Sequence, residues 1–262
     1  MATAYERVRI ARGAKRPTGI DYLQNVFHGF FELHGDRRYA DDPAIVGGLA
    51  YLGATPVTVI AIEKGHTAKE RVQRGFGAPQ PEGYRKALRL MREAEKFHRP
   101  VVCFVDTSGA GCNVGAEERG QGEAIAECLT TMSALQTPVL SILIGEGGSG
   151  GALALAAGDR VWMLENAVYS VISPEGCATI LWKDAAKAEQ AAEELKLTAD
   201  DALALGVVES VIPEAGLSEP EFYDALSQRL MRDVDALTEM PIQELLSARY
   251  ARFRRFGGEA QA

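Results

Sequence analysis

A glycine-rich run, Gly145-Glu-Gly-Gly-Ser-Gly-Gly-Ala152, is the strongest chemical signal in this sequence of 262 residues. It follows an apolar stretch typical of a buried strand and precedes small residues that favour a helix. Backbone N–H groups converge in such a turn, and the start of a helix adds about half a positive charge. The run therefore predicts a main-chain site for an anionic oxygen. A tight turn that only packs a strand against a helix is the simpler alternative.

Two nucleotide-binding patterns can be compared with this run. A P-loop needs Lys and then Ser or Thr after its last glycine, but Gly and Ala follow Gly150, which excludes that motif. Gly145, Gly147 and Gly150 do fit the dinucleotide pattern G-x-G-x-x-G. Glu165 stands roughly where a ribose-binding carboxylate belongs. However, the turn lies more than halfway along the chain and no residues for hydride transfer follow, which disfavours a dinucleotide.

A second turn, Asp106-Thr-Ser-Gly-Ala-Gly-Cys-Asn-Val-Gly115, also follows an apolar run and leads into a helical pattern. Because each turn ends a strand and begins a helix, both are expected at the same edge of the sheet. Their amides would then line one cleft that favours developing negative charge. Glu117 and Glu118, just beyond, suit the positive end of the following helix, which is a structural explanation for them.

The elements that would position these turns alternate between strand and helix patterns. This alternation predicts an α/β fold with parallel strands. The expected strands are residues 57–62, 101–105, 139–144, 161–164 and 207–212. The expected helices are residues 84–97, 116–135, 151–157, 185–195 and 199–205.

The two ends of the chain differ from this body. Residues 1–17 carry several Arg and Lys without an apolar core, so we expect a basic, solvated arm rather than a secretory signal. Residues 218–257 carry apolar side chains at helical spacing and predict a pair of amphipathic helices. Because no internal repeat or linker is visible, we expect a single domain over residues 1–262, with helical additions at both ends.

Composition narrows the function further. A hydrophobic content of 47% and a charged content of 24% predict a folded chain with a real core. The net charge of -8 argues against nucleic acid or an anionic membrane as the main partner. No stretch approaches the ~20 apolar residues that span a bilayer, so we expect a cytoplasmic protein. No metal site is expected, because the cysteines lack zinc-knuckle spacing and accompanying histidines. They are Cys103, Cys112, Cys128 and Cys177.

Three motifs make the sequence similar to a known family. They are Gly115-Ala-Glu-Glu-Arg-Gly-Gln121, Gly145-Glu-Gly-Gly-Ser-Gly-Gly-Ala-Leu153 and Val171-Ile-Ser-Pro-Glu-Gly-Cys-Ala178. Together with Pro81-Glu-Gly-Tyr-Arg-Lys-Ala-Leu-Arg-Leu90, they resemble the alpha-subunit family of bacterial acetyl-CoA carboxylase carboxyltransferases. The likeness runs from about residue 18 to 213 and returns at 249–252. Several collinear motifs are far more specific than one glycine run.

The resemblance implies the crotonase fold, in which ββα units wind into a spiral. It implies a transferase that passes a carboxyl group from carboxybiotin to acetyl-CoA, giving malonyl-CoA for fatty acid biosynthesis. The implied partners are a zinc-bearing beta subunit in an α2β2 assembly, a biotin carboxyl carrier protein and a biotin carboxylase. Biotin, held covalently by the carrier, would be the cofactor, and this chain would hold no metal.

Carried over to this sequence, the resemblance makes Gly150 and Gly151 the catalytic residues, because their backbone N–H groups would face the ureido oxygen of biotin. Biotin itself would take the methyl proton, so no side-chain base is required. The other small residues of the two turns become substrate-binding candidates. They are Gly109, Ala110, Gly115, Gly147 and Gly148.

The chain departs from the family pattern in the second turn. Gly111 stands where an aromatic residue is usual, and Asn113 replaces a glycine. These changes leave the choice of acyl-CoA and the geometry of the turn open, so a carboxyltransferase subunit for another small acyl-CoA is an alternative.

Two other functions are weaker alternatives. A stand-alone crotonase-type hydratase or hydrolase could use Glu117, Glu118 and Glu123 as acid and base. Adjacent residues of a helix cannot share a face, however, which disfavours the first two as a pair. A catalytically idle scaffold that only completes an oligomer is the alternative from another class.

Overall fold

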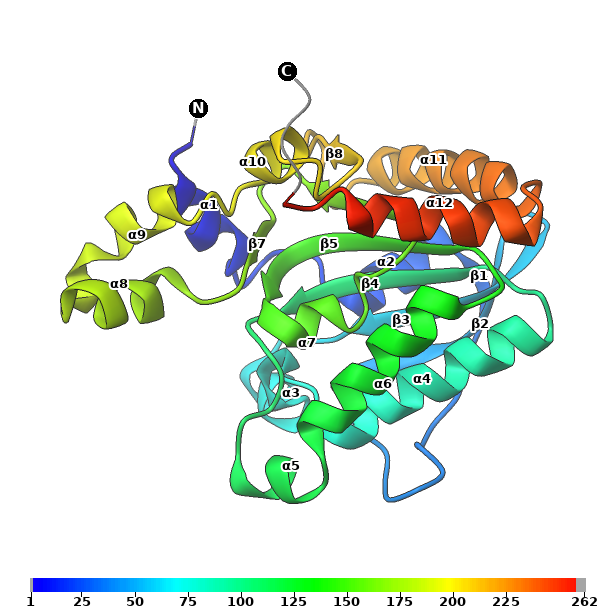
Figure 1. The fold of residues 1–262 in the computed structure, drawn as a ribbon, viewed down its shortest axis with the longest axis horizontal. Helices are drawn as coiled ribbons and strands as arrows, with labels where there is room; N and C mark the ends of the chain where they lie inside the picture. Colours follow the sequence, from blue (N-terminus) through cyan, green and yellow to red (C-terminus); the bar gives the residue numbers. More distant parts are fainter. Residues whose placement is uncertain (1, 258–262) are drawn as a thin grey trace.

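The apolar runs of the sequence form one sheet in the computed structural model, which describes residues 2–257 (Figure 1). Within these residues, eight strands lie in the order β1-β2-β3-β4-β5-β6-β8, and β7 pairs with the far end of β5. The β1–β2 and β2–β3 pairs are antiparallel, and the other pairs are parallel. The strands are β1 (His28–Glu32), β2 (Ile45–Leu52), β3 (Thr55–Ile62), β4 (Val101–Thr107), β5 (Val139–Gly148), β6 (Arg160–Leu164), β7 (Val168–Ser170) and β8 (Ser210–Ile212).

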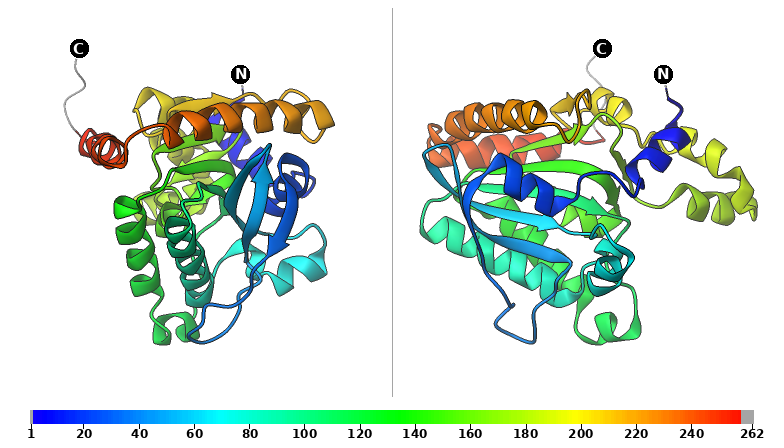
Figure 2. Two further views of the ribbon diagram at one scale, coloured as in Figure 1. Left: turned by 90° about the vertical axis from the view of Figure 1, so that its right-hand side faces the viewer. Right: turned by 180° about the vertical axis from the view of Figure 1, so that it is seen from behind.

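Helices cover both faces of this sheet, so β4 is buried along its whole length. Helices α4 and α6 lie side by side on one face, and α2 and α11 cover the other (Figures 1 and 2). Between residues 2 and 257, no helix combines the length and apolar character needed to cross a membrane. The helices are α1 (Ala4–Ala11), α2 (Gly19–Val26), α3 (Ala68–Gln73), η1 (Gly75–Gly77), α4 (Pro81–Lys96), α5 (Val114–Glu118), α6 (Gln121–Ala134), α7 (Ser149–Leu153), α8 (Pro174–Trp182), η2 (Ala185–Lys187), α9 (Ala188–Glu194), α10 (Ala199–Ala204), α11 (Pro220–Thr238) and α12 (Ile242–Arg254).

Four of the five predicted strands correspond closely to β3, β4, β5 and β6, whereas β8 covers only the second half of the predicted 207–212. Strands β1, β2 and β7 were not predicted. In β2 the reason is glycine, which weakens a strand pattern. A Cβ on Gly48 would overlap the carbonyl oxygen of Phe31, so the close approach of β1 requires glycine there.

Two of the predicted helices need correction. The helix expected at 116–135 is two helices, α5 and α6, because Gly120 adopts a left-handed φ of 79° between them. Helix α7 begins at Ser149 rather than Gly151 and ends at Leu153. Helices α2, α3 and α8 were not predicted. The helices expected at 84–97, 185–195 and 199–205 correspond to α4, to η2 with α9, and to α10.

The N-terminal segment is not the solvated arm that its basic composition suggested. Helix α1 packs with α9, and Val8 and Ala192 share a small apolar cluster. The Arg16 side chain is buried and forms an ion pair with Glu214. The expectation was wrong because an acidic residue far along the sequence, Glu214, neutralises Arg16. No local sequence pattern reveals such a partner. Together, α1, α8 and α9 form an arm that projects from the sheet (Figures 1 and 2).

The two predicted C-terminal helices are present as α11 and α12. Helix α12 is fastened by Arg249, whose side chain is 1% exposed and pairs with Asp159 at 2.7 Å. All five N–H groups of a guanidinium can donate. Here they reach both oxygens of Asp159 and the backbone oxygens of Met132, Leu135 and Thr137. One arginine therefore connects α12, the end of α6 and the start of β6.

Replacing this arginine should destabilise the fold strongly. Arg249→Ala is expected to lower the free energy of unfolding by about 3–5 kcal/mol, because Asp159 would stay buried without its partner. The matched control is Tyr250→Ala, whose side chain is 69% exposed. This control should change the free energy by less than about 0.5 kcal/mol. Urea unfolding of both variants measures the difference, and equal stabilities would contradict the anchoring role.

Candidate functional site

The two glycine-rich turns lie at the same edge of the sheet, as their positions after strands predicted. Strands β4 and β5 are parallel neighbours, and Thr107 lies opposite Gly147 near their carboxyl ends. The backbones then touch, since a Cβ on Gly148 would overlap the carbonyl group of Ser108. The glycine at position 148 is thus required by contact with the neighbouring turn.

Gly151 makes the second close contact between the turns. A Cβ at this position would lie 2.5 Å from the Ala110 nitrogen, 2.9 Å from the Gly109 carbonyl carbon and 2.8 Å from the Tyr84 hydroxyl oxygen. Gly150 differs, because the nearest atom to its added Cβ would be Ile125 Cγ2 at 3.7 Å. Gly151 is therefore locked between elements, whereas a Cβ on Gly150 would make only an ordinary van der Waals contact.

The structure brings together most of the site residues that the sequence predicted, but not all of them. Gly109, Ala110, Gly148 and Gly151 meet where the turns touch, and Gly147 lies on β5 beside them. Gly115 lies in α5, where Arg119 and Asn113 are its neighbours, and α5 is distant from α7 (Figure 1).

The altered second turn leaves no empty space at Gly111. A Cβ there would overlap the side-chain amide of Gln80. The oxygen of this Gln80 amide accepts hydrogen bonds from Asn113 Nδ2 at 3.2 Å and from Arg119 at 3.3 Å. Gln80 and Asn113 thus occupy the region where the family pattern has an aromatic residue, so Gln80 must move before an aromatic could enter.

Tyr84 holds the short helix α7 in place. The last carbonyl groups of a helix lack intrahelical partners, and five-residue α7 ends almost at once. The Leu155 N–H bonds to Ala152 rather than to Gly151. The buried Tyr84 hydroxyl donates to the Gly151 carbonyl oxygen at 3.1 Å instead. Burial raises the pKa of Tyr84, so this hydroxyl stays protonated and remains a donor.

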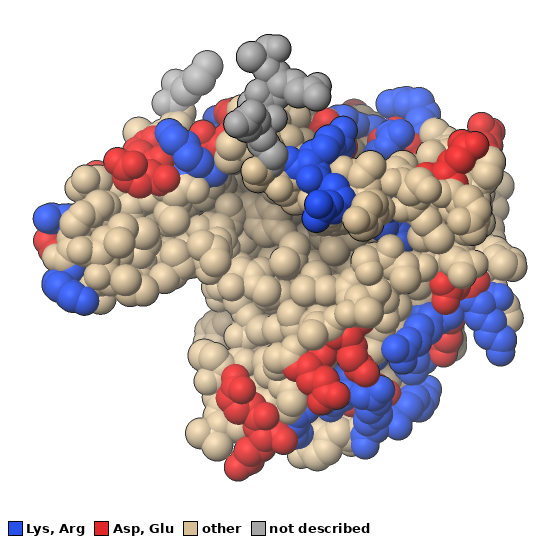
Figure 3. Space-filling model, viewed as in Figure 1, with Lys and Arg blue, Asp and Glu red and all other residues tan. Residues whose placement is uncertain are grey.

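A pocket of about 290 Å³ opens beside α7. Gly150 stands in the first turn of the helix, where N–H groups have no intrahelical partner. The surface around α7 and its junction with the arm carries few charges (Figure 3). Sequence reasoning missed the wall that β7 supplies, although the motif beginning at Val171 pointed to this region. The lining residues are Ser149, Gly150, Leu153, Tyr169, Ser170 and Val171.

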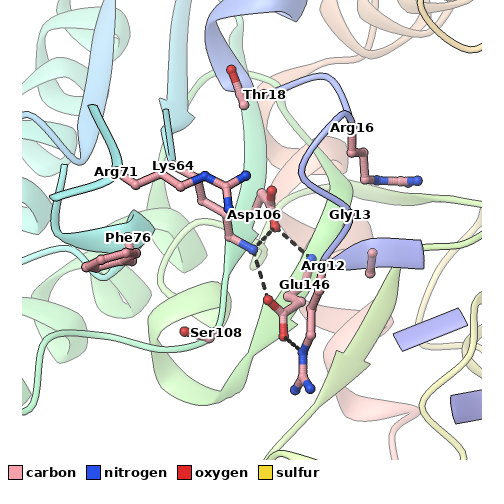
Figure 4. A pocket seen from close by; sticks show the side chains of 11 residues that line it. Arg12, Gly13, Arg16, Thr18, Lys64, Arg71, Phe76, Asp106, Ser108 and Glu146 are labelled. Atoms are coloured by element: carbon pink, nitrogen blue, oxygen red, sulfur yellow. Dashed lines mark hydrogen bonds and ion pairs between the residues drawn. The ribbon is translucent and has the colours of Figure 1, made fainter. Parts of the chain in front are cut away.

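A charged pocket of about 200 Å³ lies on the other side of the turns (Figure 4). The Lys64 ammonium lies 2.6 Å from Asp106 and 2.9 Å from Glu146, and Arg12 lies 2.8 Å from Glu146. Burial would lower the pKa of Lys64, but Asp106 and Glu146 outweigh it and raise the value. Burial would raise the pKa of Glu146, yet Lys64 and Arg12 hold it below its usual value.

This pairing gives Glu146 a structural role. Its carboxylate is held by two cations, and its N–H donates to Asp106 at 2.8 Å. Arg12 also reaches Glu175 on α8 at 2.7 Å, which ties the arm to the glycine turn. The sequence offered no signal for Lys64 or Arg12, because both lie far from residue 146 along the chain.

The acidic residues of the hydratase alternative lie away from this region. Glu117, Glu118 and Glu123 are exposed on α5 and α6, and none lines the pocket at Gly150. From residue 2 to 257, the His, Cys, Asp and Glu side chains form no group of three that could hold a metal ion.

Solved structures share this architecture. A chain of the Pseudomonas malonate decarboxylase hetero-tetramer, solved with coenzyme A, matches 91% of this chain and 98% of its own, with TM-score 0.72 and 17% identity. Transcarboxylase 12S matches 84% of this chain and 43% of its own, with TM-score 0.66 and 20% identity. The fold is crotonase-like, which confirms the expected class.

Residues 1–257 match the family described as acetyl co-enzyme A carboxylase carboxyltransferase-like, and the chain belongs to that family. The acetyl-coenzyme A carboxylase carboxyl transferase subunit alpha of Ruminiclostridium cellulolyticum is 58% identical over 255 residues, covering 97% of this chain and 98% of its own. The subunits beta/alpha chain of Natranaerobius thermophilus is 53% identical over 97% of this chain, which spans 43% of that protein. The alpha-subunit resemblance is thereby confirmed.

Acid should remove the stabilising effect of the ion cluster around Glu146. Because its folded pKa lies below the unfolded value of about 4.3, its contribution is complete above that pH and is lost as the pH falls through the folded pKa. Glu146→Gln should therefore lower the free energy of unfolding by about 1–3 kcal/mol near neutral pH.

Urea unfolding of wild type and Glu146→Gln, from neutral pH to about pH 3.5, measures this effect. The difference between the two proteins should shrink as the pH falls below about 4. A difference that stays constant across this range would show that the charge of Glu146 does not stabilise the fold.

Proposed function

We propose that this chain is the biotin-facing alpha subunit of an acetyl-CoA carboxylase carboxyltransferase. It would transfer the carboxyl group of carboxybiotin to acetyl-CoA, giving malonyl-CoA. Close identity to named alpha subunits over nearly the whole length supports the reaction class. The observation that carries the site is the contrast at the start of α7 between Gly151, which packs against the other turn, and Gly150, which lines the pocket.

The pocket beside α7 suits the bicyclic ring of biotin. Its volume of about 290 Å³ is open to one side, and Leu153 and Val171 supply exposed apolar surface. A ring of this kind needs apolar walls with a few polar groups that fix its orientation. Polar groups of the lining residues include the Gly150 backbone and the hydroxyl groups of Ser149, Tyr169 and Ser170.

When bound, carboxybiotin supplies the activated carboxyl group, and its ureido oxygen gains negative charge as that group departs. The N–H groups of Gly150 and Gly151 would donate to this oxygen, and one preorganised donor is worth about 3 kcal/mol. Tyr84 and the neighbouring turn keep these amides in position before the reaction. Glu146 is committed to ion pairs with Lys64 and Arg12, so it is poorly suited to act as a carboxylate base.

The second half of the active site would belong to a partner. The relative with joined beta and alpha sequences supports a beta subunit as that partner. We place the acyl-CoA and the zinc site in the beta subunit, with an α2β2 assembly served by a biotin carboxyl carrier protein and a biotin carboxylase. In this arrangement, the open side of the pocket faces the carrier-borne biotin.

Glycine substitution in the complex with the beta subunit tests this function. Gly151→Ala should lower kcat about 100-fold, because its Cβ forces the amide away from the other turn. Glu146→Gln should change kcat by less than about threefold, since its charge acts on the fold rather than on the reaction. The measurement is carboxyl transfer from carboxybiotin, made well below the unfolding temperature of each variant.

Thermal unfolding and assembly with the beta subunit are the controls, because the added Cβ also strains the contact with residues 109 and 110. A folded, assembled Gly151→Ala enzyme with normal turnover would show that the oxyanion site lies elsewhere.

A further inference from the structure

Ser149 has an unusual backbone for its residue type. Its φ is 51°, in the left-handed region. Glycine occupies the positions on both sides, yet Gly148 has a φ of -86°. Within the described glycine run from 145 to 151, Ser149 is the residue with a positive φ. Among residues 147–151, four are glycine, yet the backbone conformation that favours glycine is found at the serine.

Shape alone does not account for this serine. Left-handed backbone is strained for a residue with a Cβ, whereas glycine adopts it freely. Gly148 and Gly151 are explained by their contacts with the other turn. At position 149 glycine would be the less strained choice, and an observed backbone outlier of this kind beside a pocket points to a use for the serine side chain.

The Ser149 side chain is exposed. It lies at the boundary of two adjoining pockets, one lined by Gly148 and the other by Gly150. No group in residues 2–257 forms a hydrogen bond with it. In the same pocket, Ser170 already donates to the Ile172 carbonyl oxygen at 2.7 Å. Ser149 is therefore a hydroxyl that remains available to a ligand.

A serine at a sharp strand-to-helix turn also occurs as the nucleophile of hydrolases, where a histidine activates it. No histidine among the described residues lines either pocket at Ser149. His66, for example, bonds to Asp21 and Thr18 beside α2. The hydroxyl is accordingly suited to donate a hydrogen bond and not to attack a substrate.

We infer that Ser149 is a further catalytic residue, whose hydroxyl donates a hydrogen bond to the substrate oxygen that gains charge during carboxyl transfer. This inference rests on the proposed function. The donor would stand beside the Gly150 N–H, so one oxygen could accept from both. Because the bond strengthens as charge develops, its loss should lower kcat more than it raises KM.

The test compares two variants in the complex with the beta subunit. Ser149→Gly removes the hydroxyl and the strain together, so its urea unfolding midpoint should equal or exceed that of wild type. Its kcat should nevertheless fall about 10- to 100-fold, with KM changed by less than about twofold. Ser149→Ala removes the hydroxyl but keeps the strained backbone, so it should lose the same activity without gaining stability. A merely structural serine would not separate stability from turnover in this way.

Ser218→Gly is the matched control. Ser218 is exposed, has a φ of 81° and lies in the turn before α11, away from both pockets. This variant should keep wild-type kcat. Wild-type kcat in both Ser149 variants, or an effect on KM alone, would overturn the inference. Failure of the proposed function is seen separately, because the wild-type complex would then transfer no carboxyl group.

Discussion

The close contact between two backbone turns determines the form of this site. Gly148 and Gly151 pack against residues 108–110 so closely that neither position accommodates a Cβ. This contact is possible because β4 and β5 are parallel neighbours whose carboxyl ends meet. The Tyr84 hydroxyl then donates a hydrogen bond to the Gly151 carbonyl oxygen. The geometry of a five-residue helix, which has little stability of its own, is thereby set by the surrounding structure.

Charges on the opposite side of the turns connect this site to the rest of the chain. Lys64 from the end of β3 and Arg12 from the N-terminal segment both bind Glu146. Arg12 continues to Glu175, so the arm and the glycine turn share one ion cluster. Such groups are costly to bury unless paired. The two sides of the turns therefore differ: Glu146 takes part in ion pairs on one side, whereas Ser149 and Gly150 line the pocket on the other.

Sequence reasoning found the elements with local signals and missed those that depend on distant contacts. The four central strands and both turns follow apolar runs and glycine patterns, so their positions were predictable. Strand β2 was hidden by glycines that only the approach of β1 explains. The N-terminal segment was misjudged because Glu214 neutralises Arg16 from almost 200 residues away along the chain. The left-handed φ of Ser149 has no signature in sequence, since serine gives no hint of it.

The central claim is that this chain forms only the biotin half of the active site. The most direct test measures malonyl-CoA formation from carboxybiotin and acetyl-CoA by this chain, by the beta subunit and by their mixture. The account predicts product from the mixture and none from this chain alone, because the acyl-CoA is placed in the partner. Malonyl-CoA made at comparable rates by this chain alone would contradict the proposed division of the active site.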